Sequence, residues 1–245
     1  YAEPPFGERR FAAPVPAASW QGLRDATRFG ATAPQSPYQG DTAALLASVE
    51  IPGEDILTVN VWAPTDADRA PVVVWVHGGS LERGTGALEG YDGSAFARDG
   101  VVFVSMNYRL GSEGFSILDG VPRNLGLLDV IAATEWVFRE IAAFGGDPGR
   151  VTLMGESAGG ALVAAAMTTP SIGPRAHGAI IQSGPLDASP PARAGRVTRA
   201  IAKQLGIPAT REAFLAVDPQ RLVEARLAQA KRSSPLSGVG FALSL

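Results

Sequence analysis

The chain has 245 residues, with 24 acidic and 21 basic side chains and a formal net charge of −3. Hydrophobic residues make up 46% of it, which excludes a disordered chain, because disorder requires low hydrophobicity and high net charge. The cations do not exceed the anions, so the composition argues against a nucleic-acid-binding protein. No run approaches about 18 consecutive apolar residues, so we expect no membrane span. The sequence has no cysteine and two histidines, which excludes disulfides and cysteine-based zinc sites.

Short apolar runs alternate with longer helical patterns along the chain. The runs with strand character are Ile56–Ala63, Val72–Val76, Val101–Met106, Val151–Gly155 and Ala179–Ser183. The helical patterns cover Leu127–Phe144, Ser157–Met167 and an amphipathic stretch from Arg193 to Arg232, broken near Gly206–Pro208 and at Pro219. Strands that alternate with helices predict an α/β fold with a mostly parallel sheet. Ligands of such sheets bind at the carboxyl ends of the strands.

A Gly-Glu-Ser-Ala-Gly sequence at residues 155–159 matches the pattern G-x-S-x-G between a predicted strand and a predicted helix. The pattern places Ser157 on a tight turn with its Oγ exposed, in a backbone conformation that costs about 1–3 kcal/mol. Gly155 and Gly159 omit side chains that would collide as the strand and helix close on the turn. The helix N-terminus adds positive potential where an oxyanion would develop. A chance match in a glycine-rich chain is the alternative, and the strand–turn–helix context argues against it.

A second motif, His77-Gly78-Gly79-Ser80, directly follows the predicted strand Val72–Val76. Consecutive small residues allow backbone N–H groups to approach a reacting carbonyl closely. Together with the N–H of Ala158, these residues predict an oxyanion hole, in which each donor contributes about 2.7–4 kcal/mol to transition-state stabilisation. A plain glycine turn after a strand is the alternative, which the nearby serine motif disfavours.

Nine motifs occur in order along the chain. They are Tyr1–Pro5 with Arg10-Phe11, Glu54–Leu57 through Asn60-Val61, His77–Gly79, Tyr91–Gly93, Asn107–Gly111, Asn124–Asp129, Phe144–Pro148, Gly155–Gly160, and His177 with Gln182–Gly184. In this order and spacing they resemble the type-B carboxylesterase and cholinesterase family of α/β-hydrolases. The resemblance implies the α/β-hydrolase fold, a mostly parallel central sheet flanked by helices, in incomplete form. It also implies carboxylic-ester hydrolysis through an acyl-enzyme, with a small-molecule ester as substrate and with no cofactor or metal.

The resemblance implies a role for each residue of the two motifs. Ser157 would be the nucleophile, and the backbone N–H groups of Gly79, Ser80 and Ala158 would form the oxyanion hole. Gly78 and Glu156 would contribute to substrate binding, with a structural role as the alternative for Glu156. The position of Ser80 is usually glycine or alanine in the family, and only its backbone is needed.

Other charged residues receive structural roles from the resemblance. Arg10 with Glu54, and Arg109 with Asp129, resemble the buried ion pairs of the family and would support the scaffold rather than the chemistry. Many family members have cysteine where this chain has Ile56, so a disulfide found in some of them is absent here.

The chain lacks an evident acid and base for Ser157. A serine attacks an ester only if an oriented base removes its proton, and α/β-hydrolases order these residues as serine, acid, histidine. After Ser157 the sequence has a single histidine, His177, at a position that is structural in the family, and the carboxylates beyond it come too late in the order. His77 belongs to the predicted oxyanion turn. We therefore expect the acid and base to lie in a C-terminal half that the chain lacks, with both ends truncated.

Residues 1–245 would then form one fragment of an α/β-hydrolase domain, with no second domain and little or no activity alone. Ala179–Ser183 would be left as an open hydrophobic edge that is prone to aggregate. A non-catalytic binding protein or pseudoenzyme of the same fold is the alternative function, and a natural truncation is a third reading. The intact Ser157 motif argues against the binding protein. The sequence leaves both a cytoplasmic and a secreted location open.

Overall fold

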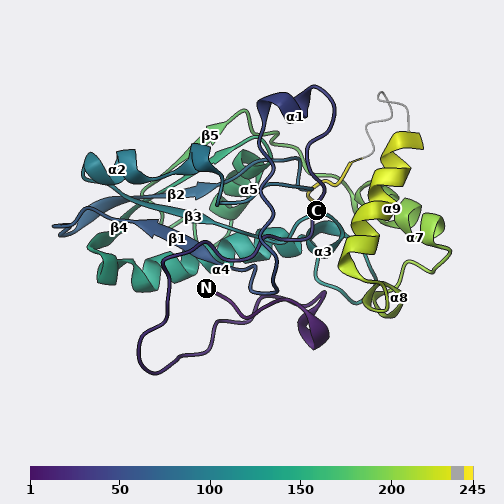
Figure 1. The fold of residues 1–245 in the computed structure, drawn as a ribbon, viewed down its shortest axis with the longest axis horizontal. Helices are drawn as coiled ribbons and strands as arrows, with labels where there is room; N and C mark the ends of the chain where they lie inside the picture. Colours follow the sequence, from purple (N-terminus) through teal and green to yellow (C-terminus); the bar gives the residue numbers. More distant parts are fainter. Residues whose placement is uncertain (233–239, 245) are drawn as a thin grey trace.

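The computed structural model describes residues 1–232 and 240–244, so positions 233–239 and 245 of the expected domain lie outside the described residues (Figure 1). In the described part, one five-stranded sheet has the order β1-β3-β2-β4-β5. The strands are β1 Val59–Trp62, β2 Ala70–Val76, β3 Val102–Met106, β4 Gly146–Glu156 and β5 Gly178–Gln182. β1 is antiparallel to β3, and the other neighbours are parallel. The predicted α/β fold with a mostly parallel sheet is confirmed.

One helix precedes the strands in the chain, four lie between strands, and four follow the last strand in the described residues. They are α1 Thr42–Leu45, α2 Ser94–Arg98, α3 Gly111–Phe115, α4 Leu125–Glu140, α5 Ala158–Met167, α6 Pro191–Ala194, α7 Arg196–Leu205, α8 Arg211–Leu215 and α9 Pro219–Arg232. Short 3₁₀ turns lie at Gly7–Arg9, Glu89–Tyr91 and Ile141–Phe144. Across the described ranges, none of these helices combines the length and hydropathy needed to cross a membrane.

Both faces of the sheet are covered, which explains the continuous apolar runs of β2 and β3. On one face, the side chains of Val72 and Ile141 lie close together over Gly146. A Cβ atom added to Gly146 would lie 2.9 Å from the Val72 side chain and 2.8 Å from that of Ile141. Phe103 lies on the opposite face and stacks on Phe96 of α2, with ring centroids 4.7 Å apart. In a strand that is buried on both faces, hydrophobic and polar residues do not alternate, because neither face contacts solvent. The sheet therefore forms the centre of a layered α/β structure.

Strand β5 forms an edge of the sheet and has little cover. Ile180 and Ile181 are 44% and 41% exposed, and Leu186, just beyond the strand, is 75% exposed. In the described part of the chain β5 pairs only with β4, so its other side presents unpaired backbone groups. The predicted open hydrophobic edge is confirmed.

One of the two predicted ion pairs is present. The Arg109 guanidinium donates two hydrogen bonds to Asp129, of 2.7 and 2.8 Å, and the Arg109 backbone N–H donates a third, of 2.9 Å. Both side chains are at most 1% exposed. The pair joins the loop after β3 to the first turns of α4, as expected of a scaffold element.

The predicted pair of Arg10 with Glu54 is wrong. Arg10 instead binds Glu113 of α3, with its Nη2 2.6 Å from the carboxylate, and also donates to the carbonyl of Val217 at 2.6 Å. Arg10 and Glu113 are both buried, whereas Glu54 is exposed. A buried guanidinium requires a partner that is desolvated with it, because an unpaired buried charge is costly. Glu113 meets this requirement, and Glu54 remains in solvent.

Helices α7, α8 and α9 lie beside α3, at one end of the sheet (Figure 1). Their apolar residues are buried, including Ile201 of α7, Phe214 of α8 and Leu222 of α9. Phe214 packs edge-on against Phe11 of the N-terminal segment, with centroids 6.2 Å apart. The amphipathic pattern of this stretch is thereby explained, and its helices approach the carboxyl ends of the strands.

Candidate active site

The two predicted motifs meet because their strands are neighbours. Val76, the last residue of β2, is in register with Gly155 near the end of β4. The chain leaves β2 at His77-Gly78, and β4 ends with Glu156 just before Ser157, at the same end of the sheet. A Cβ atom on Gly78 would lie 3.3 Å from the Cβ of Ser157 and 2.6 Å from an Oε of Glu156. Glycine at position 78 therefore lets the two loops approach each other.

Ser157 lies between the end of β4 and the start of α5 in a rare backbone conformation. Its φ is 52° and its ψ is −121°, a combination that residues other than glycine avoid. Its N–H donates to the carbonyl of Gln182 in β5 at 2.8 Å, and its carbonyl accepts from Ala161 at 3.1 Å. No hydrogen bond among the described residues uses its Oγ, so the backbone is fixed and the hydroxyl is available.

Glycines allow the strand and helix to close on this turn, as the motif spacing predicts. A Cβ on Gly155 would lie 2.5 Å from the carbonyl oxygen of Gly159, closer than real Cβ contacts allow. A Cβ on Gly159 would overlap the carbonyl oxygen of Val76 and lie 2.6 Å from that of His77. The first turn of α5 thus lies against both the strand that it leaves and the neighbouring strand.

The loop after β2 turns sharply through left-handed backbone conformations. Gly79, Ser80 and Leu81 have φ angles of 112°, 60° and 61°. Within the described ranges, no acceptor binds the backbone N–H of Gly79, Ser80 or Ala158. The last of these belongs to the first residue of α5, where N–H groups have no partner within the helix and the helix dipole is positive. These three N–H groups lie on the two segments that meet beside Ser157, and each can still donate a hydrogen bond.

His77 is a buried support of this loop. Its ring stacks on Tyr108 with centroids 4.4 Å apart, and its Nδ1 lies 2.8 Å from the carbonyl oxygen of Gly78. Burial lowers the pKa of His77 to about 4, although the hydrogen bond to Gly78 acts in the opposite direction. Its Nε2 is buried and has no hydrogen-bond partner in the described structure, so it does not contact the Ser157 hydroxyl. The neutral ring packs under the loop instead.

Comparison with known proteins assigns this arrangement to a family. Residues 1–239 match the carboxylesterase family. The chain belongs to the carboxylesterase family. Phenmedipham hydrolase of Pseudarthrobacter oxydans is 43% identical over 211 residues, and para-nitrobenzyl esterase of Bacillus subtilis (strain 168) is 42% identical over 215 residues. The structure of a thermophilic PNB esterase superposes with a TM-score of 0.88 at 37% identity and covers all of this chain. The α/β-hydrolase fold and the resemblance to the type-B carboxylesterases are thus confirmed.

This carboxylesterase-family chain spans about half the length of the relatives that it matches. The aligned part is 84% of the chain but 43% of each of the two curated relatives, and the chain covers 52% of the solved structure. It is therefore similar to the N-terminal half of these esterases.

Glu156 contributes negative charge to the site. Burial raises the pKa of Tyr91 and of Tyr38 above the ordinary tyrosine value, and the charge of Glu156 raises both further. These tyrosines therefore lie within electrostatic reach of the carboxylate and remain protonated. Within the described part of the chain, no group of three or more His, Cys, Asp or Glu side chains could hold a metal ion.

His177 lies far from Ser157. Its N–H donates to the carbonyl of Val151, beside the buried middle of β4, and β5 then runs parallel to β4 until Gln182 reaches Ser157. Ser157 follows Val151 by six positions along the extended chain, which corresponds to roughly 20 Å at about 3.3 Å per residue. His177 is thus not placed to take a proton from Ser157, in agreement with the structural role that the resemblance implies.

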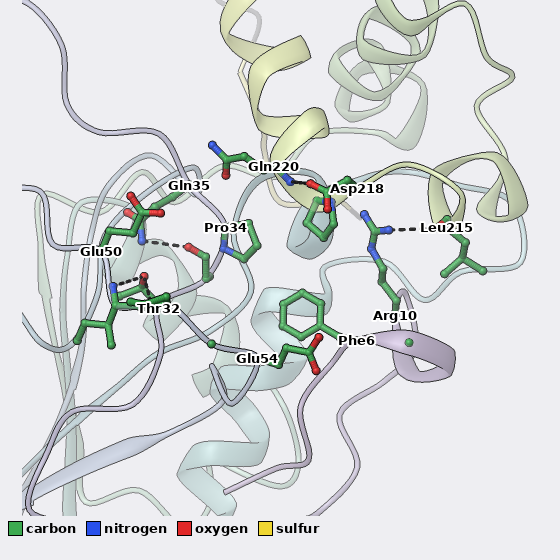
Figure 2. Close-up of a pocket in the computed structure, with 16 residues that line it drawn as sticks. Phe6, Arg10, Thr32, Pro34, Gln35, Glu50, Glu54, Leu215, Asp218 and Gln220 are labelled. Atoms are coloured by element: carbon green, nitrogen blue, oxygen red, sulfur yellow. Dashed lines mark hydrogen bonds between the residues drawn. The ribbon is translucent and has the colours of Figure 1, made fainter.

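A pocket of about 440 Å³, which Ser157 does not line, lies between the N-terminal segment and the α8–α9 junction (Figure 2). Its walls include Arg10, Glu54 and Gln35, and the Arg10 guanidinium points to the Leu215 carbonyl rather than to Glu54 (Figure 2). The side chain of Gln35 extends from this wall to the loop after β2. No sequence pattern indicates this role of Gln35, because its partner Gly84 is 49 residues away.

Proposed function

We propose that this chain carries the nucleophile and oxyanion hole of a carboxylic-ester hydrolase that forms an acyl-enzyme on Ser157. The observation that supports this function best is that the Ser157 hydroxyl and three N–H donors, none of which has a hydrogen-bond partner among the described residues, lie on two segments that meet. Those donors belong to Gly79, Ser80 and Ala158. Membership of the carboxylesterase family supports the choice of an ester as substrate.

The chemistry follows from this arrangement. The Oγ of Ser157 attacks the ester carbonyl carbon while a base removes the hydroxyl proton. The carbonyl oxygen becomes an oxyanion and accepts hydrogen bonds from the N–H groups of Gly79, Ser80 and Ala158, each worth about 2.7–4 kcal/mol. The C–O bond to the alcohol then breaks, and the alcohol takes the proton as it leaves. Water, deprotonated by the same base, releases the acid from Ser157.

Gly78 and Glu156 adjoin Ser157 in the proposed site. Gly78 leaves room between the two loops, and we assign it and Glu156 to substrate binding because both lie next to Ser157. The negative charge of Glu156 would favour a neutral ester over an anionic one and would stabilise a base that becomes a cation during the attack.

The base and its orienting acid are supplied, in this proposal, by polypeptide beyond these residues. Among the described residues neither ring nitrogen of buried His77 is hydrogen-bonded to the hydroxyl, and His177 lies just before β5, at the end of that strand far from Ser157. The esterase relatives are about twice as long as the part that this chain matches. The exposed edge of β5 offers a surface on which the remaining half of one continuous hydrolase domain would pair.

The test compares this chain with the full-length protein, each as wild type and as Ser157→Ala, on a short-chain chromogenic ester. Circular dichroism of every sample establishes that it is folded. We expect Ser157-dependent turnover from the full-length protein. We expect almost none from the folded 245-residue chain, because loss of the triad base lowers kcat by about 10⁶.

Either of two results would overturn the proposal. Rapid turnover by the 245-residue chain, abolished in Ser157→Ala, would mean that the base lies within it. A folded full-length protein without any Ser157-dependent turnover on a panel of esters would favour the non-catalytic alternative.

A further inference from the structure

The loop after β2 requires external support. Its residues Ser80 and Leu81 have left-handed φ angles, which cost about 1–3 kcal/mol each in residues other than glycine and persist only where the surroundings impose them. Within the loop, the N–H groups of Glu82 and Arg83 both donate to the carbonyl of Gly79 at 3.1 Å. We call residues 79–84 the oxyanion turn. Two internal hydrogen bonds alone do not offset the strain.

One support comes from the N-terminal segment. The side-chain amide of Gln35 accepts a hydrogen bond of 2.7 Å from the N–H of Gly84 and donates one of 3.1 Å to the carbonyl of the same residue. In the middle of the turn, the carbonyl of Leu81 accepts from the N–H of Gly111 at 2.7 Å. The end and the middle of the oxyanion turn are thus attached to neighbouring loops.

The other support comes from helix α9, 144 residues further along the chain. The guanidinium of Arg226 donates two hydrogen bonds to one carboxylate oxygen of Glu82, of 2.7 and 3.0 Å. The two side chains are 13% and 14% exposed. Gln229, on the next turn of α9, accepts a hydrogen bond from the same guanidinium. Charge-assisted hydrogen bonds of this kind are short and about twice as strong as neutral ones.

We propose that Arg226 is a positioning residue, which holds the oxyanion turn through Glu82 so that the N–H groups of Gly79 and Ser80 face Ser157. The inference rests on the proposed function and adds to it a contribution from the C-terminal helices. Glu82 follows the two donor residues by only two or three positions, so a displacement of its side chain rotates their peptide groups. Oxyanion donors act only at about 2.7–3.1 Å from the developing charge, so a small rotation removes their effect.

The test uses the full-length protein with Arg226→Gln and, as a matched control, Arg221→Gln. Arg221 lies on the same helix in an exposed pair with Glu224, with side chains 68% and 58% exposed. We expect Arg226→Gln to lower kcat about tenfold with KM within about twofold, less than the 10²–10³ that is lost with an entire donor. Binding of a trifluoromethyl ketone, which mimics the tetrahedral intermediate, should weaken by the same factor as kcat/KM. Arg221→Gln should change none of these, and Arg226→Lys should recover part of the loss.

A second measurement does not depend on catalysis. Amide hydrogen exchange in peptides that span the oxyanion turn should be about tenfold faster in Arg226→Gln and in Glu82→Gln than in Arg221→Gln, since about 1.4 kcal/mol of lost local stability corresponds to a factor of ten. If exchange in the turn and kcat are unchanged, or change equally in the Arg221 variant, the inference is wrong. If the wild-type protein shows no Ser157-dependent hydrolysis, the proposed function fails, and the exchange rates still decide whether Arg226 holds the turn.

Discussion

The backbone of Gly159, in the first turn of α5, lies directly against the backbone of Val76, so that a Cβ atom on Gly159 would overlap the carbonyl oxygen of Val76. This relationship connects the two halves of the candidate site. Val76 ends the strand that leads into the oxyanion turn, and Gly159 lies two residues after Ser157. Any side chain at position 159 would push Ser157 away from the N–H groups that we propose as oxyanion donors.

Gly159→Ala should therefore both destabilise the protein and reduce hydrolysis. Overpacking of this kind costs about 1–3 kcal/mol, and here the obstacle is backbone that cannot rotate aside. Urea unfolding and ester turnover of the full-length protein measure the two effects. Gly90→Ala is the matched control, because a Cβ on that glycine would have nothing within 4 Å. Equal stability and activity of the two variants would contradict the close approach.

Asp129→Asn should cost about 3–5 kcal/mol of unfolding free energy, because it leaves the buried guanidinium of Arg109 without its countercharge. Asp99→Asn provides the control. Its pair with Arg98 is 3.7 Å long and about three-quarters exposed, so we expect a change within about 0.5 kcal/mol. Urea midpoints at constant pH compare the two. A loss no larger in Asp129→Asn than in Asp99→Asn would show that the buried pair is not part of the scaffold.

His77 should make stability depend on pH below neutrality. Burial lowers its pKa from the ordinary value of 6.5, which applies to the unfolded chain, to about 4 in the folded protein. Between pH 4 and 6.5 the unfolded chain therefore binds more protons than the folded protein. Stability contributed by the neutral ring is complete above about pH 6.5 and is lost as the pH falls to about 4, by roughly 3 kcal/mol in total. Unfolding of wild type and His77→Gln at several pH values isolates this contribution. A wild-type curve parallel to that of the variant between pH 6.5 and 4 would contradict it.

Ile180→Lys should reduce aggregation of the 245-residue chain. The residue is 44% exposed on edge strand β5, and a charge on such an edge discourages pairing with another chain. Light scattering at rising protein concentration measures the effect. Thr169→Lys, away from the strand, controls for net charge. The same reduction in both variants would mean that net charge, and not the edge, governs association.

Local patterns predicted those parts of the fold whose causes are local. The continuous apolar runs of β2 and β3 and the period of α4 were visible in the sequence, because burial on defined faces determines both. β4 begins at Gly146, five residues before the expected Val151, because Ala70 pairs with this glycine-rich segment. The glycine and proline residues of this segment favour a loop, but backbone pairing with the neighbouring strand β2 makes it extended.

Partners that are distant in sequence could not be predicted. The sequence contains several carboxylates that could pair with Arg10, and only the folded chain shows that Glu113 is buried beside it. Gln35 and Arg226 reach the oxyanion turn from opposite parts of the chain, and no spacing rule connects them with it. The motifs thus indicated the groups proposed for the chemistry, and the groups that hold them in place depend on tertiary structure.

Covalent labelling of Ser157 tests the central claim most directly. The full-length protein is treated with a fluorophosphonate, digested, and analysed by mass spectrometry, with Ser157→Ala treated in parallel. We predict a single phosphonylated peptide that carries the adduct on Ser157, loss of ester hydrolysis in proportion to labelling, and no labelling of the variant. An adduct on another residue that abolishes hydrolysis, or hydrolysis retained in Ser157→Ala, would contradict the account.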